Sequence, residues 1–398
     1  MADIKNYLKE KEKRERNQTN YKEKIMKHKL TAVYRVLLIL LVLAAVVAVV
    51  YFQYKGHVYT GYDIVNTVPR EKGSEATDIR LGNSVLTYSK DGAHCTDAKG
   101  NVTWNQTYEI QDIKIATCQN VVAVGNYNGR SIYLGDTGKL IGEVATTMPI
   151  RNVAVSAEGH VAAVLADTDV TWINIYNSAG ENTYSSKTHM SNSGYPAAIS
   201  MSPNGELLGV SYVYVDAGVL KTNIAFYNFG PVGANQSDYM VSAYVYADLL
   251  VPVVQFMDNN TMFAVGDGRL MIYKGGQKPT MAAEYLYDQE VRSVFYNDKY
   301  VGLVFTSDNS ESQYRMDVYN TSAARVGSYY FDIDYNEIFF GTDTFVAYNE
   351  TDCLVMTLAG TEKYNGHFSK TVNLMLPTGS AYKYLLVTDN SIDTIQLK

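Results

Sequence analysis

The sequence has few of the residues that build metal centres and disulfide frameworks. Only three cysteines occur in 398 residues, Cys95, Cys118 and Cys353, and no two of them form a Cys-x-x-Cys pair. Neither a zinc site nor a disulfide framework is specified, so no metal is predicted. A single bridge between Cys95 and Cys118 stays open.

Familiar catalytic motifs are also absent. The sequence contains no Gly-x-Ser-x-Gly elbow, no Walker loop and no dinucleotide fingerprint, so acyl transfer and nucleotide chemistry lack their usual signatures. The histidines after residue 55 are scattered without ligand spacing. Asp332 and Asp334 would share one face of a strand as a carboxylate pair for glycoside chemistry, but such neighbours are more often solvated or paired with lysine. We therefore predict no enzyme, no catalytic residue and no cofactor.

Basic residues are scarce outside the first 35 positions. Residues 1–35 carry 11 Lys and Arg against 5 Asp and Glu, which leaves 23 against 36 for the remainder. Nucleic-acid binding depends on neutralising phosphates with Lys and Arg, so an acidic main domain argues against a nucleic-acid partner.

One long apolar run is present. No charged residue occurs from Val36 to Tyr54, and Val36 to Val50 contains only Leu, Ile, Val and Ala. As a helix, these 19 residues would extend roughly 28 Å, close to the roughly 30 Å thickness of the hydrocarbon layer. The run therefore predicts one transmembrane helix, over residues 33–54.

The flanking charges predict the orientation of this helix. Lysines and Arg35 precede it, whereas only Lys55 follows closely, so the N-terminal side should stay in the cytoplasm. The predicted division is a basic cytoplasmic tail at 1–32, the span at 33–54 and an extracytoplasmic domain at 55–398. The tail is either a solvated helix or disordered segment, or a contact with anionic lipids. A cleaved secretory signal is the competing interpretation, but Ala44, Ala45 and Ala48 lack the Ala-x-Ala spacing.

The large domain is predicted to be all-β, because short Val-, Ile- and Tyr-rich runs alternate with Gly, Asn and Asp turns. A repeated strand ends in Tyr-Asn or a similar pair, and it aligns Tyr176, Tyr227, Tyr273 and Tyr319. In three weaker copies of the repeat, Thr96, Leu134 and Met356 align with these tyrosines. The separations of 37 to 51 residues are typical of four-stranded propeller blades.

The repeat count predicts a β-propeller of eight blades, which begin near residues 77, 111, 151, 197, 251, 291, 335 and 372. The last copy ends after about three strands, and the apolar segment Val58 to Val68 is free to supply its fourth strand. Such a closure removes exposed sheet edges. Seven blades are the alternative, if two weak copies merge.

Two segments carry a resemblance to a known family. Gly194 to Tyr212 (GYPAAISMSPNGELLGVSY) and Ile224 to Gly233 (IAFYNFGPVG) resemble an uncharacterised family of membrane-anchored propeller proteins of Gram-positive anaerobic bacteria. The resemblance implies one span and an extracytoplasmic propeller, without an established activity. The Ser202 to Gly205 turn is similar to the inner turn of WD-repeat propellers, and Asp97 to Trp104 is similar to one quinoprotein repeat.

Tyrosine is unusually frequent, with 34 residues. These rings would pack between blades or form a ligand-binding face. The longest repeat spacings fall in the third and fourth blades, whose inserts are rich in Tyr, Asn, Ser and Gly. The predicted partner-binding residues are His189, Tyr195, Tyr212, Tyr214, Phe229 and Tyr239.

These observations predict a membrane-anchored, non-catalytic binding or scaffolding module for a protein or a cell-envelope polymer. The alternatives are an enzyme acting on envelope glycans or peptides, and a transmembrane sensor.

Overall fold

The computed structural model describes residues 2–73, 75–166, 170–189 and 194–398 and divides the chain into two units, residues 1–58 and 59–398. The first unit is one helix, α1 (Ala2–Gly56). It includes both the predicted span and the charged tail, for which the sequence left helix or disorder open. Among the described residues, α1 is long and apolar enough to cross a membrane by length and composition, a test that a signal sequence also meets.

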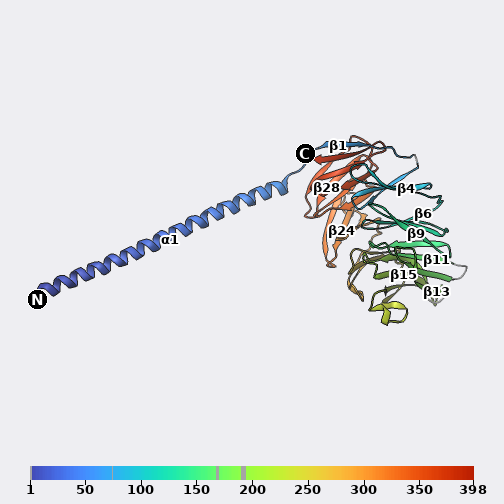
Figure 1. Cartoon of the computed structure of the whole chain (residues 1–398), viewed down its shortest axis with the longest axis horizontal. Coiled ribbons are helices and arrows are strands. Elements are labelled where there is room, and N and C mark those ends of the chain that lie inside the picture. The colour runs from blue at the N-terminus through green and yellow to red at the C-terminus, as the bar shows by residue number, and fades with distance from the viewer. Residues whose placement is uncertain (1, 74, 167–169, 190–193) are drawn as a thin grey trace. The chain divides into compact units, whose positions relative to one another are not determined.

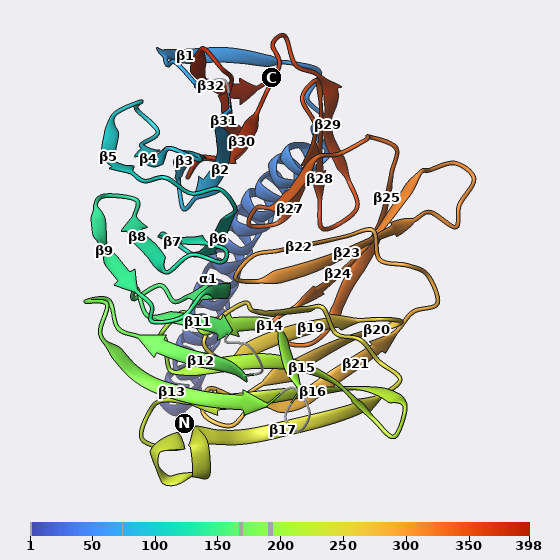
Figure 2. The same cartoon turned by 90° about the vertical axis from the view of Figure 1, so that its right-hand side faces the viewer.

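The second unit is a propeller of eight four-stranded antiparallel sheets (Figures 1 and 2). Each predicted blade start lies within two residues of an observed first strand, from Thr77 in the first blade to Leu374 in the last. The eight-blade prediction is therefore confirmed, and the seven-blade alternative is wrong. First strands of neighbouring blades contact one another, so they surround the axis of the ring.

The first four blades follow directly in sequence, with strands numbered outward from the axis. Their strands are β2 (Thr77–Leu81), β3 (Ser84–Ser89), β4 (Gly92–Thr96) and β5 (Val102–Thr107); β6 (Ile113–Cys118), β7 (Val121–Asn126), β8 (Ser131–Asp136) and β9 (Leu140–Ala145); β10 (Ile150–Val155), β11 (Val161–Ala166), β12 (Val170–Tyr176) and β13 (Asn182–His189); and β14 (Tyr195–Met201), β15 (Leu207–Asp216), β16 (Val219–Asn228) and β17 (Met240–Ala247). Two single turns of 3-10 helix, η1 (Gly233–Asn235) and η2 (Ser237–Tyr239), lie between β16 and β17.

The remaining blades are built in the same way, except that the last one joins the two ends of the domain. Their strands are β18 (Val253–Phe256), β19 (Thr261–Gly266), β20 (Arg269–Lys274) and β21 (Thr280–Leu286); β22 (Ser293–Tyr296), β23 (Tyr300–Thr306), β24 (Tyr314–Asn320) and β25 (Arg325–Phe331); β26 (Glu337–Phe340), β27 (Thr344–Tyr348), β28 (Asp352–Thr357) and β29 (Glu362–His367); and β30 (Leu374–Pro377), β31 (Lys383–Val387), β32 (Ser391–Leu397) and β1 (Tyr62–Pro69).

An N-terminal strand closes the ring, as predicted. β1 pairs antiparallel with β32, with Tyr62 opposite Leu397 and Pro69 opposite Ser391. The strand begins four residues later than the predicted Val58. The sheet edge that β32 would otherwise leave open is thereby paired.

The alternating strand directions give the propeller two distinct faces. One face, which we call the turn face, carries the turns that join first to second strands and third to fourth strands. We call the opposite face, with the second-to-third hairpins and the links between blades, the crossover face. Because β1 is a fourth strand, it begins on the turn face.

The repeated residues stabilise the turn face. The aligned tyrosines Tyr176, Tyr227, Tyr273 and Tyr319 lie near the ends of third strands and are buried. In three blades the residue after this aligned position, which is Thr96 in the first blade, caps the following turn. Its side-chain oxygen accepts from backbone N–H groups two and four residues onward. These caps are Asp97, Asn177 and Asn320.

Aromatic side chains link neighbouring blades at the same face. An aromatic residue of a fourth strand donates to a backbone oxygen at the third-to-fourth-strand turn of the next blade. Five interfaces share this bond: Trp104 to Asp136, Tyr184 to Asp238, Tyr244 to Pro279, Tyr285 to Ala323 and Tyr329 to Leu358. The expectation that many tyrosines pack between blades therefore agrees with the structure.

The remaining expectations about local chemistry have clear outcomes. All three cysteines are free thiols, so the Cys95–Cys118 bridge is not formed. Asp332 and Asp334 do not share a strand face, because β25 ends at Phe331. Their carboxylates instead accept from the Gln313 backbone N–H and the Tyr314 hydroxyl, at 2.7 and 2.8 Å.

Candidate functional site

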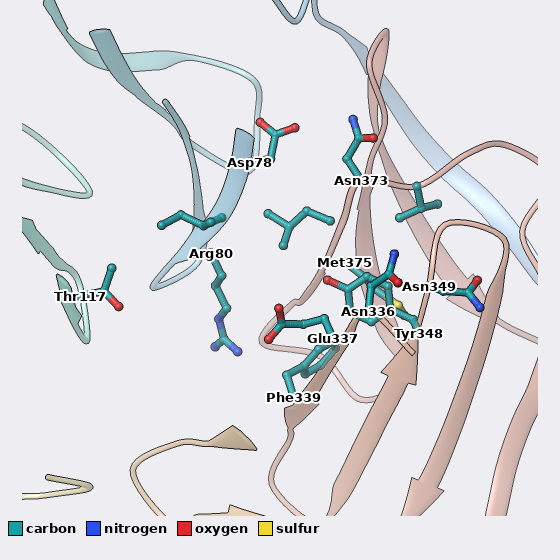
Figure 3. A pocket seen from close by; sticks show the side chains of 13 residues that line it. Asp78, Arg80, Thr117, Asn336, Glu337, Phe339, Tyr348, Asn349, Asn373 and Met375 are labelled. Atoms are coloured by element: carbon teal, nitrogen blue, oxygen red, sulfur yellow. The ribbon is translucent and has the colours of Figure 1, made fainter. Parts of the chain in front are cut away.

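The described residues form a channel along the propeller axis, where the first strands of several blades meet. A cavity of about 280 Å³ lies between the first, seventh and eighth blades (Figure 3). A second cavity, of about 630 Å³, extends to the first-to-second-strand turns on the turn face. Arg80, Thr117, Glu337 and Phe339 line both cavities, so the two spaces meet at these side chains.

Arg80 projects into the channel from β2. Its Nε donates to the carbonyl oxygen of Gly82 at 2.9 Å, which fixes the base of the guanidinium. Burial lowers the pKa of Arg80, while the charges of Asp298, Tyr348 and Glu337 oppose that shift. Arginine stays charged in proteins, so a positive group faces the channel.

Glu337, the first residue of β26, supplies a negative charge opposite. Figure 3 shows the ends of the Arg80 and Glu337 side chains directed toward each other. Burial raises the pKa of Glu337, and Arg80 partly offsets the rise. Both side chains are surrounded by protein yet reached by solvent, as expected in a water-filled channel. No ion pair joins them in the described part of the chain, so the guanidinium can still donate hydrogen bonds and the carboxylate can still accept them.

Apart from Asp298, which also lines the larger cavity, the walls include the neutral polar side chains of Tyr296 and Cys118. Burial raises the pKa of Tyr296 to about 12 and that of Cys118 to about 11. At neutral pH the phenol keeps its proton, and Cys118 is a thiol rather than the reactive thiolate. Tyr296 and Cys118 can therefore donate hydrogen bonds into the channel.

Asp78 lines the crossover-face end of the channel but is already engaged. Its fully buried carboxylate accepts from Arg70 at 2.9 and 3.3 Å and from the Thr87 hydroxyl at 2.7 Å. Lys72 lies 3.4 Å from the same carboxylate. Because Arg70 and Lys72 follow β1, this cluster ties the closing blade to the first blade.

The predicted partner-binding residues do not form one surface. Tyr195, at the start of β14, and Tyr214, near the end of β15, lie half-buried toward the crossover face. Phe229 and Tyr239 flank the loop between β16 and β17 on the turn face. His189 ends β13, but its side chain lies outside the described residues, as do residues 190–193.

Tyr212 is a core residue rather than a surface residue. Its side chain is 2% exposed and packs among apolar residues of the third and fourth blades. Its hydroxyl shares a 2.9 Å hydrogen bond with that of Tyr227. A partner cannot contact Tyr212 in this conformation, so that assignment is corrected.

Phe229 and Tyr239 belong to an aromatic cluster between blades. Their ring centroids lie 5.8 Å apart, and Tyr184 of the third blade lies 5.1 Å from Phe229 and 4.9 Å from Tyr239. Tyr184 also donates to the Asp238 carbonyl at 3.1 Å. The structure thus brings these two predicted residues together in an interface between blades.

Arg80 and Glu337 were not predicted from the sequence. Each is a single charged residue on a first strand, and the two come from blades distant in sequence. A charged side chain on a predicted innermost strand was the available signal, because inner strands face either the core or the channel.

One protein family and several solved structures are similar to this chain. A family model described as a family of unknown function (DUF5711) matches residues 55–397. No curated protein matches the chain. Among solved structures, BamB from Moraxella catarrhalis is 10% identical, with a TM-score of 0.47 and coverage of 84% of this chain and all of that one. Hsv2 from Kluyveromyces lactis is 8% identical, with a TM-score of 0.48 and coverage of 75% and 99%.

Proposed function

The chain belongs to the family of unknown function DUF5711, and from this premise we propose that it is a membrane-anchored, non-catalytic module that binds or scaffolds a protein or a cell-envelope polymer outside the cytoplasm. The observation that carries the proposal is the unpaired Arg80 and Glu337 in the axial channel. Charged side chains kept apart in a confined space favour a polar ligand that bridges them.

The two faces support a binding role for the crossover face. On the turn face, side chains cap the turns and neighbouring blades bond to one another, so many of its polar groups already have partners. The crossover face carries one end of the channel, lined by Asn336, Asn349 and Asn373. Amide side chains both donate and accept hydrogen bonds, which suits recognition of varied polar groups.

The anchor is α1, inserted with its basic end in the cytoplasm. Support comes from its apolar segment and from the lysines and Arg35 on the N-terminal side. The absence of catalysis is supported by the protonation of the channel groups, because Cys118 and Tyr296 hold their protons at neutral pH.

Photocrosslinking in living cells tests this proposal with two positions in one blade. A photoreactive amino acid replaces Tyr214 near the crossover face or, as the matched control, the exposed Asn235 on the turn face. We expect covalent capture of a partner from position 214 and little from position 235. Capture of cytoplasmic proteins, or equal products at both positions, would contradict the proposal.

Protease added to intact cells should digest the propeller and spare residues 1–32.

A further inference from the structure

Two cations contact one tyrosine ring on the crossover face. The Lys114 Nζ lies 5.3 Å from the centroid of Tyr127, and the Arg151 Cζ also lies 5.3 Å from it. Lys114 is on β6 and Arg151 on β10, while Tyr127 directly follows β7. The three residues therefore meet where the second and third blades adjoin.

Tyr195 extends this group to the fourth blade. Burial raises the pKa of Tyr195, nearby Tyr127 adds to the rise, and the positive charge of Arg151 opposes it. Tyr195 is half-buried at the start of β14, so part of its ring faces solvent. We call Lys114, Tyr127, Arg151 and Tyr195 the basic-aromatic patch.

The charges of the patch have no acidic partner in the described part of the chain. The Arg151 guanidinium donates to Asn128 Oδ1, a neutral group, and Lys114 stays exposed. Asp167 and Asp169 lie outside the described residues. Both cations lie within 5.3 Å of the centroid of one ring, so an anion bound beside this ring is attracted by two positive charges.

Backbone hydrogen bonds hold the patch in place. The Asn128 N–H donates to the Ile150 oxygen at 2.9 Å, and the Ile150 N–H donates back to the Gly129 oxygen at the same distance. Tyr127 is fixed by its N–H, which donates to the Asp112 oxygen at 2.8 Å. Binding therefore needs little ordering of this segment, which favours affinity.

We propose that the basic-aromatic patch docks an acidic segment of a protein partner, with Arg151 and Lys114 binding Asp or Glu carboxylates and Tyr127 and Tyr195 packing against the adjoining chain. This proposal rests on the proposed binding function and names the class of partner. Arg pairs with carboxylates through two parallel bonds, and Tyr and Arg dominate the energetics of protein interfaces. A long polyanion would also meet the acidic remainder of the propeller, whereas a short acidic segment contacts only the patch.

The test uses the full chain in detergent or nanodiscs and a fluorescent octaglutamate peptide. Fluorescence anisotropy at low salt should show binding that weakens as salt is added. The double variant Lys114→Gln/Arg151→Gln should lose at least about tenfold in affinity, as expected for charge-assisted bonds. Arg151→Lys alone should lose less, because the charge remains while the paired geometry is lost.

Lys139→Gln is the matched control, because it removes one exposed charge at a turn on the opposite face. We expect its affinity to change by less than about twofold. The proposal is overturned if this control loses as much as the double variant, if octaglutamate does not bind, or if polyphosphate binds more tightly through the same residues. Loss of octaglutamate binding with intact crosslinking at position 214 would reject the acidic segment while sparing the proposed function. The thermal unfolding of each variant should match that of the native chain.

Discussion

The turn face and the crossover face of the same propeller use their polar residues differently. On the turn face, Asn177 caps its own turn and Tyr285 bonds to the next blade. On the crossover face, Arg151 and Lys114 have no acidic partner among the described residues. Arg80 lies inside the channel, close to the turn between β2 and β3, where it donates to Gly82. The repeated residues therefore hold the ring together, and the residues that occur once are the better candidates for binding.

The largest expected effect on stability comes from Asp78. This residue lies near the crossover face, yet it stabilises the ring as the residues of the turn face do. Replacing Asp78 with Asn leaves Arg70 and Lys72 without their buried carboxylate. Removal of one partner from a buried ion pair costs about 3–5 kcal/mol, so we expect a fall of about 3 kcal/mol in the free energy of unfolding. Chemical denaturation of the full chain measures it.

Asp389→Asn is the control for this substitution. Asp389 also faces Lys72, at 3.7 Å, but its side chain is 68% exposed. An exposed pair contributes about 0–1 kcal/mol, so the control should change stability little. Equal effects of the two substitutions would show that the cluster around Asp78 does not close the ring.

A smaller effect should follow from the bonds between blades on the turn face. Tyr285→Phe removes the hydroxyl that donates to the Ala323 oxygen at 2.8 Å and leaves the ring in place. A lost hydrogen bond of this type costs about 1 kcal/mol, which denaturant titration can detect. The same change at the exposed Tyr330 should cost less, and a larger loss there would argue against the role of these bonds.

The difference between repeated residues and residues that occur once also explains which features could be predicted from the sequence. Blade number and blade starts were predictable because every copy carries its own turn residues, such as Asn177 or Asn320, and errors in one copy are corrected by the others. The closing strand followed from a missing fourth strand and a free apolar segment. These are local and repeated signals.

The binding candidates were harder to predict because their setting is not local. Tyr212 and Tyr214 lie on the same side of one strand, yet only Tyr212 is covered by the adjoining blade. The tyrosine content of the segment does not distinguish the two. Arg80 and Glu337 become neighbours only when the ring closes, so no pattern within one repeat identifies them.

The smallest expected effect concerns the charge pair in the channel and separates binding from stability. Burial raises the pKa of the Glu337 carboxyl above its ordinary value of 4.5. The folded chain therefore protonates this carboxyl more readily than the unfolded chain does. The charged carboxylate therefore lowers stability above the folded pKa, and this penalty disappears as the pH falls below 4.5. Glu337→Gln should be slightly more stable than the native chain at pH 7, with the difference vanishing near pH 4.

Thermal unfolding at several pH values measures this difference, and solvent in the channel keeps it small. Glu109→Gln, which removes an exposed carboxylate that does not line the channel, is the control. A Glu337→Gln variant that is less stable at pH 7 would mean that Arg80 and Glu337 stabilise each other directly. The pair would then belong with the residues that hold the ring together, and the channel would lose the unpaired charges on which the binding proposal rests.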